Sequence, residues 1–147
     1  MNDFGPLIGV WHVEGVIPVE PPVKMSGEAR IERLGEFVVL RTVGGTGGAP
    51  DSISIIGGAA DGEPQPMHYF DGRGVSRLYL MAIEGSTWKI WRAPGENWNG
   101  PDGPGFDQRF IGEISADGHR IDARWERSTA SGADQWEIDF PITYVRK

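Results

Sequence analysis

The residues of this chain that could do chemistry are polar side chains set within apolar faces of predicted strands. Arg77 and Tyr79 alternate with Val75, Met81 and Ile83, so a period of two places all of them on one face. A buried guanidinium is costly unless it meets a carboxylate, an aromatic ring or a ligand. The alternative for each such residue is that it lies near a strand end and reaches water.

Other polar residues occupy comparable positions in their strands. Two arginines and a tyrosine inside an apolar barrel could bind the carboxylate of an amphipathic molecule, because guanidinium forms a bidentate, charge-assisted pair with it. For Arg41 and Arg92, contact with water at a strand end stays open as the alternative. The predicted ligand-binding residues are Arg41, Tyr69, Arg77, Tyr79, Arg92, Trp98, Gln108 and Trp125. No catalytic residue is assigned.

Known catalytic and metal-binding motifs are missing from the sequence. The histidines His12, His68 and His119 have no metal-ligand spacing, and the glycine run 44–48 lacks the Lys and the helix of a phosphate loop. No Gly-x-Ser-x-Gly elbow occurs, and the absence of cysteine excludes disulfides and thiolate chemistry. We therefore expect no metal and no cofactor. His68 alternates with Tyr69, and the pattern does not decide which of them faces inward.

The elements that position these residues are clearest in the last third of the chain. Three runs there alternate apolar and polar residues, with turn signals at 116–118 and 131–133, which predicts an antiparallel meander. The apolar faces of the three runs are Phe106, Phe110 and Ile114; Ile121, Ala123 and Trp125; and Trp136, Ile138, Phe140, Ile142 and Tyr144. The opposite faces, with Asp139 among them, are expected to be wet.

Earlier segments add further strands to this meander, at about residues 7–16, 24–33, 36–43, 52–59, 67–71, 75–83 and 87–92. In the third of these, Phe37, Val39 and Arg41 are expected to share the inner face. About ten short strands without a 3.6-residue period indicate a sandwich or a barrel, and up-and-down order favours the barrel. We predict an all-β fold with one domain over residues 1–147, an up-and-down antiparallel β-barrel of about 8–10 strands with room for a ligand.

Gly9-Val10-Trp11 near the start and Arg146 near the end resemble the calycin superfamily of lipocalins and fatty-acid-binding proteins. The resemblance implies a lipocalin-like barrel in which Trp11 closes the base and Arg146 lies across its ring. It also implies a carboxylate site of the kind that fatty-acid-binding proteins build from arginine and tyrosine.

Three further segments, 69–75, 108–110 and 136–146, look like a family of uncharacterised bacterial lipocalin-like proteins, over about half of the chain. That family supplies no activity. The opening Gly-x-Trp-x-x-x-Gly is also similar to haem-binding nitrobindin-like barrels, which need a histidine on a late strand. The late His119 lies beside an Asp-Gly turn, so haem binding is not expected.

Composition narrows the classes of function. The net charge of −7 argues against nucleic-acid and anionic-membrane partners. No signal segment opens the chain and the apolar runs are too short to span a bilayer, so a cytoplasmic location is expected. The leading hypothesis is binding of a small hydrophobic or amphipathic molecule in the barrel. One alternative is a cyclase or isomerase with residues 93–105 as a lid; another is a structural protein with a solid core. A homodimer is left open.

Overall fold

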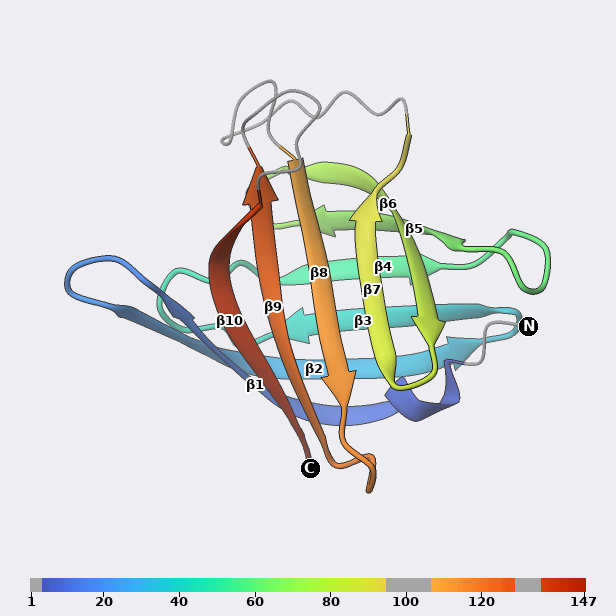
Figure 1. Ribbon diagram of the computed structural model, residues 1–147, viewed down its shortest axis with the longest axis horizontal. Coiled ribbons are helices and arrows are strands. Elements are labelled where there is room, and N and C mark those ends of the chain that lie inside the picture. Colours follow the sequence, from blue (N-terminus) through green and yellow to red (C-terminus); the bar gives the residue numbers. More distant parts are fainter. Residues whose placement is uncertain (1–3, 95–106, 129–135) are drawn as a thin grey trace.

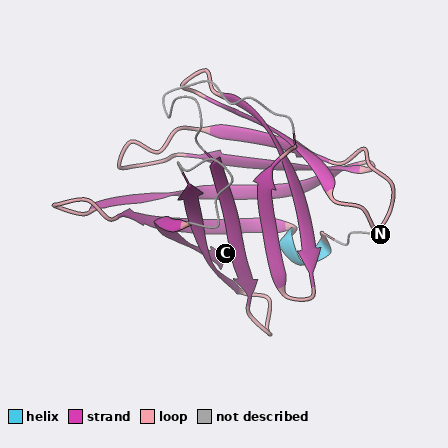
Figure 2. Ribbon diagram, turned by 45° about the horizontal axis from the view of Figure 1, so that its top comes forward, coloured by secondary structure: helices cyan, strands magenta, loops and turns pink. Residues whose placement is uncertain are grey.

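The computed structural model describes residues 4–94, 107–128 and 136–147, and it confirms the predicted all-β barrel. A short 3-10 helix, Gly5–Leu7, precedes the strands. Each strand pairs antiparallel with its neighbours along the chain, and β1 pairs with β10 to close the barrel (Figures 1 and 2). The strands are β1 Gly9–Ile17, β2 Val23–Leu34, β3 Phe37–Val43, β4 Ser52–Ile56, β5 Gln65–Asp71, β6 Ser76–Glu84, β7 Thr87–Arg92, β8 Asp107–Ile114, β9 Arg120–Ser128 and β10 Glu137–Arg146.

Arg146 and Trp11 close one end of the barrel, as the resemblance of the sequence to calycins implies. The Arg146 guanidinium lies 4.1 Å from the centre of the Trp11 ring, and it donates to the carbonyls of Ile8 at 2.7 Å, Pro6 at 2.8 Å and Gly118 at 3.1 Å. The indole of Trp11 is fully buried and donates to the Leu7 carbonyl at 2.9 Å. This end is therefore sealed by groups whose hydrogen bonds are made within the chain.

Gly9 is required by this closure. Its φ is +139°, a region that residues with a Cβ rarely adopt, and a Cβ placed there would overlap Nη1 of Arg146. The first residue of the Gly-x-Trp pattern is thus explained by the close approach of the guanidinium to the β1 backbone.

An aromatic layer separates the closed end from the rest of the interior. Tyr144 contacts Trp11 edge-on with ring centres 6.4 Å apart, and Trp88 lies 5.5 Å from Tyr144 and 4.6 Å from Phe110. Trp88 and Phe110 are at most 1% exposed. Edge-to-face contacts of this kind add to the large apolar area that aromatic rings bury, so this layer is a solid part of the core.

Two face assignments from the sequence are wrong. In β3 the buried residues are Val38 and Leu40, whereas Phe37 is 41% exposed and Arg41 lies on the outer face. Both faces of this strand carry apolar residues, and on the outer face Val39 is paired with Ile55 of β4. Alternation with a period of two therefore cannot identify which face of β3 points into the barrel.

The second wrong assignment lies in β10. A register shift between Ile138 and Phe140 makes Asp139 an extra residue opposite β9. Such a β-bulge reverses the alternation of side chains beyond it, which leaves Ile138 58% exposed and brings Asp139 to the inside together with Phe140.

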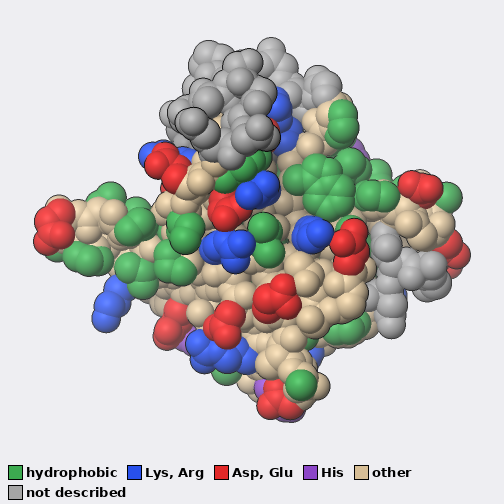
Figure 3. Space-filling model, in the orientation of Figure 1, with side chains coloured by type: hydrophobic (Ala, Val, Ile, Leu, Met, Phe, Trp, Pro, Cys, Tyr) green, Lys and Arg blue, Asp and Glu red, His purple; other side chains and the backbone are tan. Residues whose placement is uncertain are grey.

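The outer face of β8 and β9 is wet, as their alternation predicts. Figure 3 shows cationic and anionic side chains interspersed over these strands. Glu126 accepts hydrogen bonds from Arg109 at 2.6 Å and from Arg124 at 2.9 Å, which bury its carboxylate on the outer surface. Within the described ranges, no helix has the length and apolar character needed to cross a membrane.

Candidate ligand-binding site

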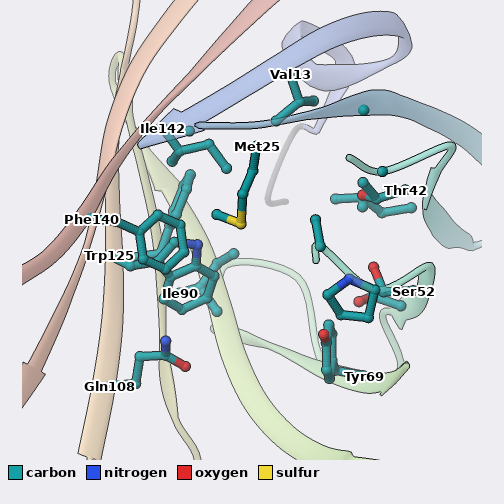
Figure 4. A pocket seen from close by; sticks show the side chains of 18 of the residues that line it. Val13, Met25, Thr42, Ser52, Tyr69, Ile90, Gln108, Trp125, Phe140 and Ile142 are labelled. Carbon is teal, nitrogen blue, oxygen red and sulfur yellow. The ribbon is translucent and has the colours of Figure 1, made fainter. Parts of the chain in front are cut away.

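A cavity of about 350 Å³ occupies the barrel above the aromatic layer. Its floor is formed by Trp88, Phe110 and Tyr144, and it extends to the β3–β4 loop, where Gly45 and Pro50 line it. Inner-face side chains from strands all around the barrel project into it (Figure 4). The volume falls in the range of small-molecule sites, about 300–1,000 Å³.

Arg77, Tyr79 and Gln108 come together in the wall of this cavity. The side-chain oxygen of Gln108 accepts from the Tyr79 hydroxyl at 3.2 Å and from Nη1 of Arg77 at 3.5 Å. Arg77 is 8% exposed and Tyr79 is 2% exposed, so a guanidinium is held in a nearly dry wall. The inward positions predicted for these residues are correct, and β6 and β8 bring them together from distant parts of the sequence.

Aromatic residues surround this polar group. The rings of Tyr69 and Trp125 lie 6.0 and 6.1 Å from the Tyr79 ring, and Trp125 lies 5.2 Å from Phe110. Both Tyr69 and Trp125 line the cavity, and they were among the predicted site residues. His68 is exposed and its neighbour Tyr69 lines the cavity, so Tyr69 is the inward-facing residue of the two.

Asp71 anchors a second polar group at the cavity. Its side chain is fully buried; it accepts from the Tyr69 hydroxyl at 2.7 Å and from Arg73 at 2.7 Å through Nη2 and 2.9 Å through the backbone N–H. Burial acts to raise the pKa of Asp71, but the hydrogen bonds from Arg73 and Tyr69 outweigh it and lower the pKa to about 2. Burial and the bond to Asp71 raise the pKa of Tyr69, which therefore stays a neutral donor.

Sequence reasoning missed Asp71 and Arg73 as site residues. Tyr69, Asp71 and Arg73 are spaced two apart, which is the spacing of one strand face, and that signal could have found them. The sequence Asp71-Gly72-Arg73-Gly74 is also a strong tight-turn signal, and that interpretation alone gives Asp71 and Arg73 no role at the cavity. Both roles hold, since the turn places Arg73 at the cavity.

Three further cavity residues were also missed, namely Thr42, Ser52 and Ser54 of β3 and β4. The reversed face of β3 hid Thr42, and a hydroxyl in a strand gives no signal of its own against a polar outer face. Asp139 enters the cavity wall only through the bulge in β10, which the sequence does not announce.

The other predicted site residues lie elsewhere. Arg92 does not line the cavity and pairs with Asp107, with Nε and Oδ1 3.3 Å apart. Arg41 is exposed on the outer face of β3. Trp98 lies outside the described residues, as does most of the segment considered as a lid. Among the described residues, no group of three or more His, Cys, Asp or Glu side chains could hold a metal ion.

Comparison with known proteins gives a match in structure and none in sequence. No protein-family model matches the chain, and no curated protein matches it. The crystal structure of Rv2717c from M. tuberculosis superimposes with a TM-score of 0.60 at 12% identity, over 97% of this chain and 93% of that one. The likeness is one of fold. It places the whole barrel, from β1 to β10, in an architecture seen by experiment.

Proposed function

We propose that this protein binds a small hydrophobic or amphipathic molecule with a carboxylate inside a lipocalin-like barrel. The observation that carries the proposal is the cavity of about 350 Å³ with the nearly buried guanidinium of Arg77 in its wall. The Trp11–Arg146 closure supports a calycin-like relationship, because it is the arrangement that the resemblance of the sequence implies.

The two parts of the cavity suit the two parts of such a ligand. A carboxylate beside Arg77 gains a charge-assisted hydrogen bond in a site from which water is largely excluded. An apolar body packs against Phe110, Trp125 and Ile142, where each Å² removed from water contributes roughly 25 cal/mol. The alternative of a solid structural core is disfavoured by the cavity itself.

The decisive experiment compares two probes that differ only in their head group. Dodecanoate and dodecanol are titrated against the wild type, Arg77→Met and the control Arg41→Met, using displacement of a fluorescent fatty-acid analogue. We expect dodecanoate to bind about 10- to 100-fold tighter than dodecanol to the wild type, as for a hydrogen bond to a charged group. Arg77→Met should abolish this preference, and Arg41→Met should retain it because Arg41 lies on the outer face.

Two results would refute the proposal. If neither dodecanoate nor dodecanol binds, the cavity does not take an amphipathic molecule. A preference for dodecanoate that survives in Arg77→Met would show that the carboxylate site is placed wrongly. Native mass spectrometry of protein purified from its own host then identifies the natural acid.

A further inference from the structure

Four hydroxyl-bearing side chains adjoin one another on one side of the cavity. Thr42 of β3 is paired with Ser52 of β4, and Ser54 of β4 is paired with Tyr69 of β5. Side chains directly opposite one another in an antiparallel pair have Cβ atoms about 4.5–5.5 Å apart. These four residues therefore form a continuous strip, which we call the hydroxyl wall. Tyr69 is in turn paired with Arg77 of β6, so the guanidinium adjoins this wall.

The facing side of the cavity is mostly apolar. Figure 4 shows Phe140, Ile142 and Trp125 across the pocket from Thr42, Ser52 and Tyr69. Val13 of β1 and Met25 of β2 continue this apolar side. Its polar exceptions are Gln108 of β8 and Asp139, which the bulge in β10 places next to Phe140. The two walls thus differ in chemistry along the length of the cavity.

Three members of the hydroxyl wall have free hydrogen-bonding capacity. The hydroxyls of Thr42, Ser52 and Ser54 make no hydrogen bond to any other residue that the structure describes. Ser54 is only 1% exposed and faces the cavity. Hydroxyls that face a cavity and have no protein partner can both donate to and accept from a bound molecule, so the three are suited to partners on a ligand.

We propose that the ligand is facially amphipathic: a rigid molecule with hydroxyl or keto groups along one edge and hydrocarbon along the other. Its polar edge faces Thr42, Ser52 and Ser54, its apolar edge faces Phe140 and Ile142, and its carboxylate reaches Arg77. This inference rests on the proposed binding function and narrows its ligand class. A linear fatty acid presents methylene groups in every direction and would leave the three hydroxyls without partners.

The test uses two bile acids as probes. Chenodeoxycholate carries both hydroxyls on one face of the steroid, whereas its epimer ursodeoxycholate carries one on each face; the carboxylate and the composition are the same. We expect the wild type to bind chenodeoxycholate about two- to ten-fold tighter, as one to two neutral hydrogen bonds would give. The double variant Ser52→Ala/Ser54→Ala should bind both epimers equally. The control Ser76→Ala, exposed on the outer face of β6, should keep the preference.

The outcomes separate this inference from the function on which it rests. Equal affinity for the two epimers in the wild type, or a preference that persists in the double variant, overturns the facial arrangement. If Arg77→Met still weakens dodecanoate in that case, binding of an amphipathic acid stands. Failure of bile acids and dodecanoate alike overturns both. Since the epimers are compared in the wild type, the facial arrangement can be refuted even if the double variant fails to fold.

Discussion

Each end of the barrel contains an inward arginine, and the two are used differently. At the closed end, Arg146 donates to three backbone carbonyls and covers the Trp11 ring. At the cavity, Arg77 lies 3.5 Å from the side-chain oxygen of Gln108 in a wall that a ligand can reach. The three carbonyls belong to the 3-10 helix, to Ile8 directly after it and to the turn between β8 and β9, so Arg146 is held by main-chain groups, whereas Gln108 contacts Arg77 through a side chain.

In this barrel the closed end contributes mainly to stability, and the cavity end is available for ligand binding. The aromatic layer of Trp88, Phe110 and Tyr144 lies between the two ends, so the closed end can be packed tightly without occupying the cavity. Substitutions at the closed end should therefore lower the free energy of unfolding, and substitutions around the cavity should mainly change affinity.

The largest expected effect is at Trp11. Trp11→Ala should lower the free energy of unfolding by about 3–5 kcal/mol, because the indole is fully buried. Met25→Ala, which truncates a half-buried side chain beside the existing cavity, should cost about 1 kcal/mol. Urea unfolding of both variants measures the difference. Equal losses would show that the two ends do not differ in their contribution to stability.

A somewhat smaller effect is expected at Gly9. Gly9→Ala places a Cβ against Arg146 at a φ of +139°, and we expect a loss of about 2–4 kcal/mol. Gly35→Ala is the control, because Gly35 also has a positive φ of +59° but has no atom near its Cβ position. It should cost only about 1 kcal/mol. If the thermal unfolding midpoints of the two variants coincide, the guanidinium contact contributes nothing.

The smallest of the three main effects on stability, apart from the controls, is expected at Asp71, on the cavity side. The pKa of its carboxyl is 3.8 in an unfolded chain and about 2 in the fold, so folding favours the carboxylate. Its contribution is complete above pH 3.8 and is lost as the pH falls toward 2, which amounts to about 2 kcal/mol. Urea unfolding at pH 5 and pH 2.5 should show a steeper acid loss in the wild type than in Asp71→Asn. Parallel losses would argue against the pairing with Tyr69 and Arg73.

The fold was predictable from the sequence because most strands alternate cleanly between faces. The same alternation placed Arg77, Tyr79 and Gln108 inside, because the apolar residues two positions away on the same strand face must be buried. It failed at β3, where Val39 and Val38 on opposite faces are equally apolar, and at Asp139, where one extra residue changes the face. Neither the two apolar faces of β3 nor the bulge in β10 can be recognised from an apolar/polar alternation with a period of two.

The hydroxyl wall of the cavity was beyond sequence reasoning for a different reason. Thr42, Ser52 and Ser54 are informative only as a strip across β3 and β4, and that strip exists because of strand register. Register depends on pairing between segments, which a single sequence specifies weakly. The resemblance to calycins contributed the closed end, where Trp11 and Arg146 are opposite one another in β1 and β10.

The pairing of β1 with β10 has a consequence for synthesis on the ribosome. The first strand to be synthesised, β1, cannot complete its pairing until the last has been made. The reason is that β10 supplies both a pairing partner for β1 and Arg146, which closes this end of the barrel. Until then the nascent sheet has two open edges, at β1 and at the newest strand, and open edges invite pairing with other chains. A chain whose synthesis stops within β9 would therefore expose two unpaired strand edges and be prone to aggregation. Protection by chaperones would be needed until β10 has been made and has paired with β1.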